Sequence, residues 1–224
     1  WTWNNIASYD KTIGDHHFNV LAGMEAYSYR YDELTASRTK MAQPDMPELV
    51  VGSQLTGGSG YRIDYALVGY LTQALYDYQN KYFFSASFRR DGSSRFAAGH
   101  RWGFFPSFSA GYDIARTPYF QKMALPVSQL KVRVSYGRLG NQNGAGLYDY
   151  IAQMPLDAQG TNAWLLPGIS SSTASKGTIA QTPKMISPYI TWEKVDNANL
   201  GFDLMLFKNR LSITADLYQR TTRD

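Results

Sequence analysis

The connections between extended segments alternate between short and long along this chain. Short turns are predicted at 14–15, 78–81 and 208–210. The connection at 116–129 falls on the same side and is longer, because Pro118 and Pro126 forbid regular strand pairing there. Long connections fall between these, at 34–60, 92–101 and 141–189. An antiparallel meander with two unlike ends is the pattern of a transmembrane β-barrel.

Apolar and polar residues alternate with a period of two, which predicts about eight strands. Segment 211–218 shows the pattern, because its odd positions are apolar and its even positions are mostly polar. Segment 82–90 follows the same rule, with Phe83 as an exception. Most predicted strands approach the about 9–11 residues that a tilted strand needs to cross a bilayer, whereas strands in soluble proteins average about 5–6.

Aromatic residues make up 15% of the 224 residues and include 17 Tyr. Tyr and Trp favour membrane interfaces, because one end of the ring is apolar and the other is polar. Six lie near predicted strand ends or turns: Trp1, Trp3, Tyr78, Tyr82, Tyr112 and Trp192. A soluble β-sandwich or barrel with one solvated face gives the same alternation. Strand length, the alternating connections and these aromatics favour the membrane barrel.

Composition excludes several classes of function. The net charge of +4 is spread along the chain, so we expect no nucleic-acid binding. The absence of Cys excludes disulfides, thiolate metal sites and cysteine nucleophiles. No apolar run approaches 18 residues, so no membrane-spanning helix is predicted. The chain starts at Trp1 inside a strand-like pattern, and we interpret it as an interior piece of a longer protein without its signal peptide.

No catalytic set of residues stands out, so we predict neither an enzyme nor a cofactor. The histidine pair 16–17 lies beside a turn, without a carboxylate at metal-ligand spacing. The glycine-rich segment 140–146 lacks the lysine and helix of a phosphate loop, so we predict a strand exit with positive φ. Segment 91–94 has the composition of a turn, and Glu193 and Asp196 are interpreted as residues of a solvated strand.

Nine segments, taken in order, carry a family resemblance. They read LAGME (21–25), GYL (69–71), YDY (76–78), FRRDGSSRF (88–96), RWGFFPSFSAGY (101–112), LKVRVSYGRLGNQ (130–142), ITWEK (190–194), NLGFD (199–203) and LFKNRLS (206–212). This series resembles the barrel of SusC/RagA-type TonB-dependent outer-membrane transporters. The resemblance covers nearly the whole chain, and the combination of segments is specific.

The resemblance implies an all-β fold, in which about eight meandering antiparallel strands belong to a transmembrane β-barrel of about 22 strands with a plugged lumen. It implies active import of a glycan or peptide across the Gram-negative outer membrane. The implied partners are a SusD-like surface lipoprotein acting as a substrate-capturing lid, the TonB complex and outer-membrane lipid. Residues 1–224 would form part of one barrel domain, without the plug, the TonB box and the remaining strands. Such an arc has two open edges, which would not persist alone in lipid.

Within that fold the two rows of each strand receive opposite roles. The lipid-facing candidates are Phe84, Phe88, Leu204, Leu211 and Ile213. The candidates that face the lumen or plug are Ser85, Arg89, Arg133, Asp203 and Asp216. The candidates for contact with substrate or the lid lipoprotein are Tyr148, Tyr150, Asn162 and Trp164. Aromatic faces stack on sugars and fill peptide side-chain pockets, but these aromatics also fit packing within the long loop itself.

Two alternatives to active import stay open from the sequence. One is a soluble secreted β-protein that binds carbohydrate, in which the apolar rows close an interior. The other is a passive outer-membrane porin, whose flux does not depend on the proton gradient. In the active importer and in the porin, the apolar rows form a continuous outward belt.

Overall fold

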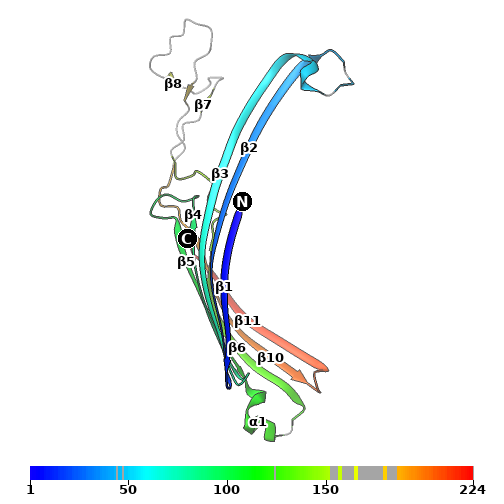
Figure 1. The fold of residues 1–224 in the computed structure, drawn as a ribbon, viewed down its shortest axis with the longest axis vertical. Coiled ribbons are helices and arrows are strands. Elements are labelled where there is room, and N and C mark those ends of the chain that lie inside the picture. The colour runs from blue at the N-terminus through cyan, green and yellow to red at the C-terminus, as the bar shows by residue number, and fades with distance from the viewer. Residues whose placement is uncertain are drawn as a thin grey trace.

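The computed structural model describes residues 1–43, 45–46, 48–123, 125–151, 156–157, 164–165, 179–180 and 186–223. Eight strands form one antiparallel sheet in the order β1-β2-β3-β4-β5-β6-β10-β11, so each long strand pairs with the long strands before and after it (Figure 1). Their bounds are β1 Thr2–Ile13, β2 His16–Met41, β3 Gly52–Tyr78, β4 Tyr82–Ser93, β5 Trp102–Asp113, β6 Val127–Asn141, β10 Glu193–Leu206 and β11 Leu211–Arg223. The meander confirms the all-β fold and the predicted number of strands.

The minor elements lie in the connections. A small three-stranded sheet has the order β7 (Leu156–Asp157), β9 (Ile179–Ala180) and β8 (Trp164–Leu165). The helical turns are η1 (Leu49–Val51), η2 (Ile114–Arg116) and α1 (Pro118–Lys122). Thr117 caps α1, because its side chain accepts a hydrogen bond from the backbone N–H of Phe120. In the described part of the chain, no helix has the length and hydropathy needed to span a membrane.

Short connections lie together at one end of the sheet, the lower end in Figure 1. In the β3–β4 turn, Gln79 and Asn80 have φ of 56° and 51°, the conformation of a tight hairpin turn that matches the twist of the strands. In the β10–β11 turn, Phe207, Lys208 and Asn209 also have positive φ. The β2–β3, β4–β5 and β6–β10 connections leave the opposite end. The predicted division of the connections between the two ends of the sheet is therefore confirmed, but their lengths do not alternate strictly, because the β5–β6 connection at the lower end spans 114–126 and the β2–β3 connection at the opposite end spans only 42–51.

The predicted loop at 34–60 is wrong for most of its length. Strands β2 and β3 stay paired from Leu34 opposite Gly60 to Met41 opposite Gly52, so the connection between them is short. Neither face of this region is buried, and a strand solvated on both faces has no apolar row to reveal it. The turn predicted at 91–94 is also wrong, since Asp91, Gly92 and Ser93 belong to β4 and pair with β3.

The two faces of the sheet differ strongly in polarity. Cross-strand partners share a face, so the register assigns every residue to one side. One side, the apolar face, carries Phe84, Phe88, Leu204, Leu211 and Ile213. The other side, the polar face, carries Ser85, Arg89, Arg133, Asp203 and Asp216. The structure thus sorts the ten residues as the alternation predicts; that one side meets lipid and the other the lumen stays a prediction.

Aromatic residues border the apolar face at both ends. Near the short turns, Tyr78, Tyr82 and Tyr112 form a ladder with ring centroids 6.2 Å and 4.9 Å apart. Near the long connections, Tyr70 stacks on Trp102 at 6.1 Å. Strand β5 passes through about ten positions between these borders, the span of a tilted strand across a bilayer. We call the apolar face between these borders the belt.

A small core lies at the end with the long connections and includes Phe96, Phe105, Ala145 and Trp192. The indole N–H of Trp192 donates a hydrogen bond to the carbonyl of Arg101 at 2.8 Å, and its side chain is buried. The predicted interfacial position of Trp192 is therefore wrong. The prediction of positive φ in 140–146 is also wrong, because only Gly14 and Gly99 have positive φ among the described glycines. Gly140 is required for space, since a Cβ there would lie 2.1 Å from the ring of Phe105.

Candidate functional site

Strands β2 and β3 extend past the end of β4 and rise alone above the sheet (Figure 1). We call residues 29–65 the projecting hairpin. Beyond the belt its apolar face becomes charged, with the register pairs Arg30–Asp64 and Arg62–Asp32 forming ion pairs. Arg30 Nε lies 2.8 Å from an Asp64 oxygen. The arginine lies on β2 in one pair and on β3 in the next. The hairpin therefore presents a solvated surface with no net excess of charge at these four positions.

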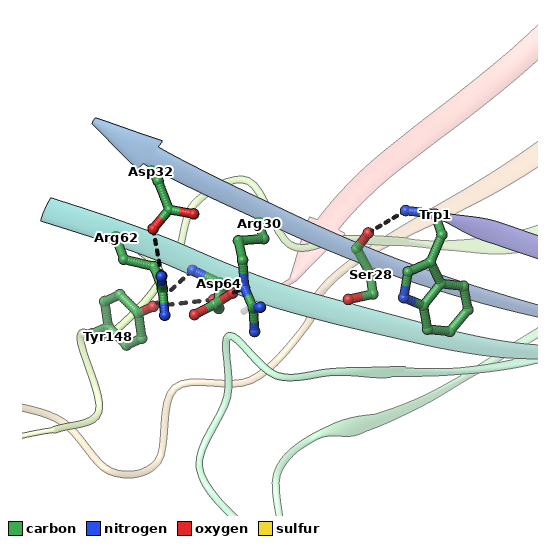
Figure 2. Close-up of polar contacts among 7 residues, drawn as sticks. All are labelled: Trp1, Ser28, Arg30, Asp32, Arg62, Asp64 and Tyr148. Carbon is green, nitrogen blue, oxygen red and sulfur yellow. Dashed lines mark hydrogen bonds and ion pairs between the residues drawn. The ribbon is translucent and has the colours of Figure 1, made fainter. Parts of the chain in front are cut away.

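Tyr148 joins the β6–β10 connection to the projecting hairpin (Figure 2). Its hydroxyl accepts a hydrogen bond from the backbone N–H of Asp64 and donates one to the Asp64 carbonyl, both at 3.1 Å. Two residues further along β3, the Ser94 hydroxyl accepts a hydrogen bond from the Ala66 backbone N–H at 2.9 Å, and the Ser94 backbone N–H donates one to the Ala66 carbonyl at 3.0 Å. Together, Tyr148 and Ser94 provide hydrogen-bond partners for the backbone groups of β3 just above the point where β4 ends.

This contact bears on the residues predicted to touch a substrate or lid. Both hydrogen bonds of the Tyr148 hydroxyl are made with the hairpin, so this hydroxyl is not free. Tyr150 is half-buried in the same connection. Asn162 lies outside the described residues, and Trp164 is placed only as the first residue of β8. Contact of these four residues with a ligand therefore stays a prediction.

The polar face of the hairpin, together with the adjoining position 27 of β2, carries a tyrosine array that sequence reasoning missed, defined as Tyr27, Tyr29, Tyr31, Tyr61 and Tyr65. The centroid of the Tyr65 ring lies 5.6 Å from that of Tyr27 and 5.1 Å from that of Tyr29. The Tyr31 and Tyr61 rings are 6.0 Å apart. Tyrosine at every second position from 27 to 31 was the available signal, but the contacts of these residues with Tyr61 and Tyr65 depend on the strand register, which residue spacing does not show.

Two ion clusters form on the polar face lower in the sheet. Arg89 bonds Asp91 at 2.7 Å and Glu25 at 3.3 Å. The second cluster contains Arg133, which bonds Asp203 at 2.6 Å and Asp216 at 3.4 Å. Three residues predicted separately to face the lumen thus form one cross-strand network. Glycines leave room for these groups, because a Cβ at position 201 would lie 2.7 Å from an Asp216 oxygen.

Cross-strand pairing also brings carboxylates to His17, which the spacing along the chain did not reveal. The Nδ1 atom of His17 lies 2.8 Å from an Asp77 oxygen, and its Nε2 atom lies 3.1 Å from an Asp10 oxygen. The amide of Asn19 also donates to Asp10. In the described ranges, no three His, Asp or Glu side chains have an arrangement that would hold a metal ion.

Asp196 is not a solvated residue, as the sequence suggested, but is buried. It accepts hydrogen bonds from Arg138 Nε at 2.7 Å and from the Tyr136 hydroxyl at 3.1 Å. The register places Arg138 directly opposite Asp196. Glu193 has a different role, since it accepts a hydrogen bond from the side-chain amide of Asn141. Both carboxylates therefore fasten β6 to β10, which gives no support for a catalytic pair.

Comparison with known proteins agrees with this geometry. A family model described as "TonB dependent receptor-like, beta-barrel" matches residues 1–224. TonB-dependent receptor P39 of Formosa agariphila is 30% identical, with 98% of this chain and 20% of the relative covered. TonB-dependent receptor SusC of Bacteroides thetaiotaomicron is 27% identical, with 100% of this chain and 21% of SusC covered. The chain thus spans about one fifth of the length of these curated relatives.

Solved structures share the fold. The RagAB peptide transporter superposes with a TM-score of 0.82 at 26% identity, covering 99% of this chain and 23% of that chain. The RagAB peptide importer in its "open-open" state gives a TM-score of 0.81 at 27% identity, covering 100% of this chain and 23% of that chain. The meander, the belt and the full-length family match lead to one conclusion: this chain belongs to the β-barrel family of TonB-dependent receptor-like proteins.

Proposed function

We propose that this chain forms part of the wall of an outer-membrane transporter that imports a nutrient, a glycan or a peptide, with energy supplied through TonB. The observation that carries the proposal is the belt. Its large apolar side chains stay exposed, with Phe84, Val134 and Leu200 each at 50–54% of their full exposure. A soluble β-protein would bury this row, whereas a barrel turns it toward lipid.

In this proposal the apolar face meets the outer-membrane lipid and the polar face meets the lumen or a plug. The ion clusters around Arg89 and Arg133 fit a wet interior, because their charges are paired but partly exposed. The projecting hairpin stands at the extracellular mouth, where a SusD-like lipoprotein would act as a substrate-capturing lid. The names of SusC and of the RagAB peptide transporter support nutrient import for this family member as well.

The test uses the full-length protein that contains this chain, expressed in a Gram-negative host. The protein should fractionate with the outer membrane and change its gel mobility on boiling, as a folded barrel does. Uptake of labelled maltooligosaccharides and of labelled peptides is then measured with and without a protonophore. Active import predicts that uptake stops when the proton gradient collapses. Uptake that continues unchanged would instead assign a passive pore.

A further inference from the structure

Glu33 lies at the centre of the upper tyrosine array. The hydroxyls of Tyr31 and Tyr61 both donate to its Oε2 atom, at 2.7 Å and 2.9 Å. Tyr61 is the register partner of Glu33, and Tyr31 lies two residues before it on the same strand. One carboxylate and two aromatic rings therefore meet on one face of the projecting hairpin.

In the part of the chain that the structure describes, the charge of Glu33 is not balanced by a basic side chain. Its neighbours on the opposite face of the hairpin, Asp32 and Asp64, pair with Arg62 and Arg30. Among the described residues, no Lys or Arg nitrogen lies within ion-pair distance of Glu33. The hydrogen bonds from Tyr31, and then from Tyr61, lower the pKa of Glu33, so the carboxylate stays ionised at neutral pH.

The rings beside this carboxylate are open to solvent. Tyr31 is 40% exposed and Tyr61 is 50% exposed, although both hydroxyls are held by Glu33. The array already accommodates one cation at its lower end, where the guanidinium of Arg95 lies 5.2 Å from the centroid of the Tyr65 ring. Aromatic rings next to a carboxylate attract guanidinium and ammonium groups through both cation–π and ionic contacts.

We propose that Glu33, Tyr31 and Tyr61 form a binding site for the basic side chain, arginine or lysine, of an extended peptide substrate. The carboxylate accepts charge-assisted hydrogen bonds from the guanidinium or ammonium group, and the tyrosine rings contact its apolar stem and cationic head. The site lies on the polar face, above Arg89, and so borders the lumen in the proposed barrel. The role in peptide uptake rests on the proposed import function, whereas the cation site itself does not.

The experiment compares two fluorescent octapeptides that differ only at one central residue, arginine or its neutral isostere citrulline. Fluorescence anisotropy measures their binding to the purified full-length protein. We expect the arginine peptide to bind about tenfold more tightly, the effect of one charge-assisted hydrogen bond. Glu33→Gln should bring the two affinities within about twofold. The matched control Asp32→Asn, which removes a carboxylate from the adjacent position on the opposite face, should leave the preference intact.

A second pair of variants separates the ring from the hydroxyl. Tyr61→Phe keeps the ring and should retain most of the preference, whereas Tyr61→Ala should reduce it about threefold. Equal binding of the two peptides to the wild-type protein, no measurable binding, or a preference that survives Glu33→Gln would overturn the proposal. A preference in binding without uptake driven by the proton gradient would uphold the cation site and refute the import function on which its biological role rests.

Discussion

Replacing Ala86 by Arg tests whether the apolar face meets lipid. Ala86 lies on that face at the middle of β4, four positions from Tyr82 at one border of the belt and four from Arg90 at the other. With a rise of about 3.4 Å per residue and a tilt of about 40°, each border lies about 10 Å away along the membrane normal. An arginine there would sit at the bilayer midplane. It should therefore destabilise the barrel by about 3 kcal/mol, or about a hundredfold in the folding equilibrium.

The matched control is Ser87→Arg, which places the same charge one residue further along β4 and on the polar face. The full-length protein is folded into lipid vesicles and titrated with urea, and the folded fraction is read from the mobility of unboiled samples. Ser87→Arg should lower the free energy of unfolding by less than about 1 kcal/mol, because Ser87 is only half-buried on the polar face and the charge would not enter lipid. Equal losses, or a larger loss for Ser87→Arg, would refute the assignment of the two faces.

Three smaller perturbations test the end of the sheet with the long connections. Tyr148→Phe removes both hydrogen bonds to the backbone of Asp64 and should speed amide exchange in the hairpin by an amount equivalent to about 1 kcal/mol; unchanged exchange would show that the contact is absent. Gly140→Ala drives a methyl group into the ring of Phe105 and should lower the free energy of unfolding by about 1–3 kcal/mol, whereas wild-type stability would contradict the packing. Hydrogen bonds from two tyrosine hydroxyls lower the pKa of Glu33, so these bonds stabilise the hairpin above the pH at which a free Glu ionises and are lost as the pH falls through the folded pKa. The rate of amide exchange in the wild-type hairpin should therefore approach that of Glu33→Gln in acid. A difference in exchange rate between the two proteins that stays constant with pH would refute this linkage.

The sheet could be predicted from the sequence wherever one face was apolar and the other polar. Segment 211–218 shows this, since its odd positions form part of the belt and the strand was assigned correctly. The same rule failed in 34–60, because a hairpin solvated on both sides needs no apolar row. Gly57, Gly58 and Gly60, of a residue type depleted in strands, also lie in a strand there.

The side-chain clusters were less predictable than the strands, because they depend on register. Arg133, Asp203 and Asp216 were assigned to one row, yet nothing in their spacing shows that three strands bring them together. His17 was judged without a carboxylate for the same reason, since Asp77 lies 60 positions away in sequence. Register is fixed by the alignment of whole strands, and the position of a single charged residue along the chain does not determine it.

Strand β3 connects the belt to the candidate binding surface without a break. Ala74 lies in the belt, Tyr70 lies at its border, Asp64 holds Tyr148, and Tyr61 contacts Glu33. The free energy of inserting the barrel depends on residues in the belt, whereas Glu33 lies several positions beyond it in solvent. Substitutions at Glu33 should therefore change ligand preference while leaving the folded fraction in the membrane unchanged. A loss of binding in a Glu33 variant can therefore be interpreted as a loss of contact with the ligand. Residues at one end of β3 affect folding into the membrane, and residues at its other end affect ligand binding.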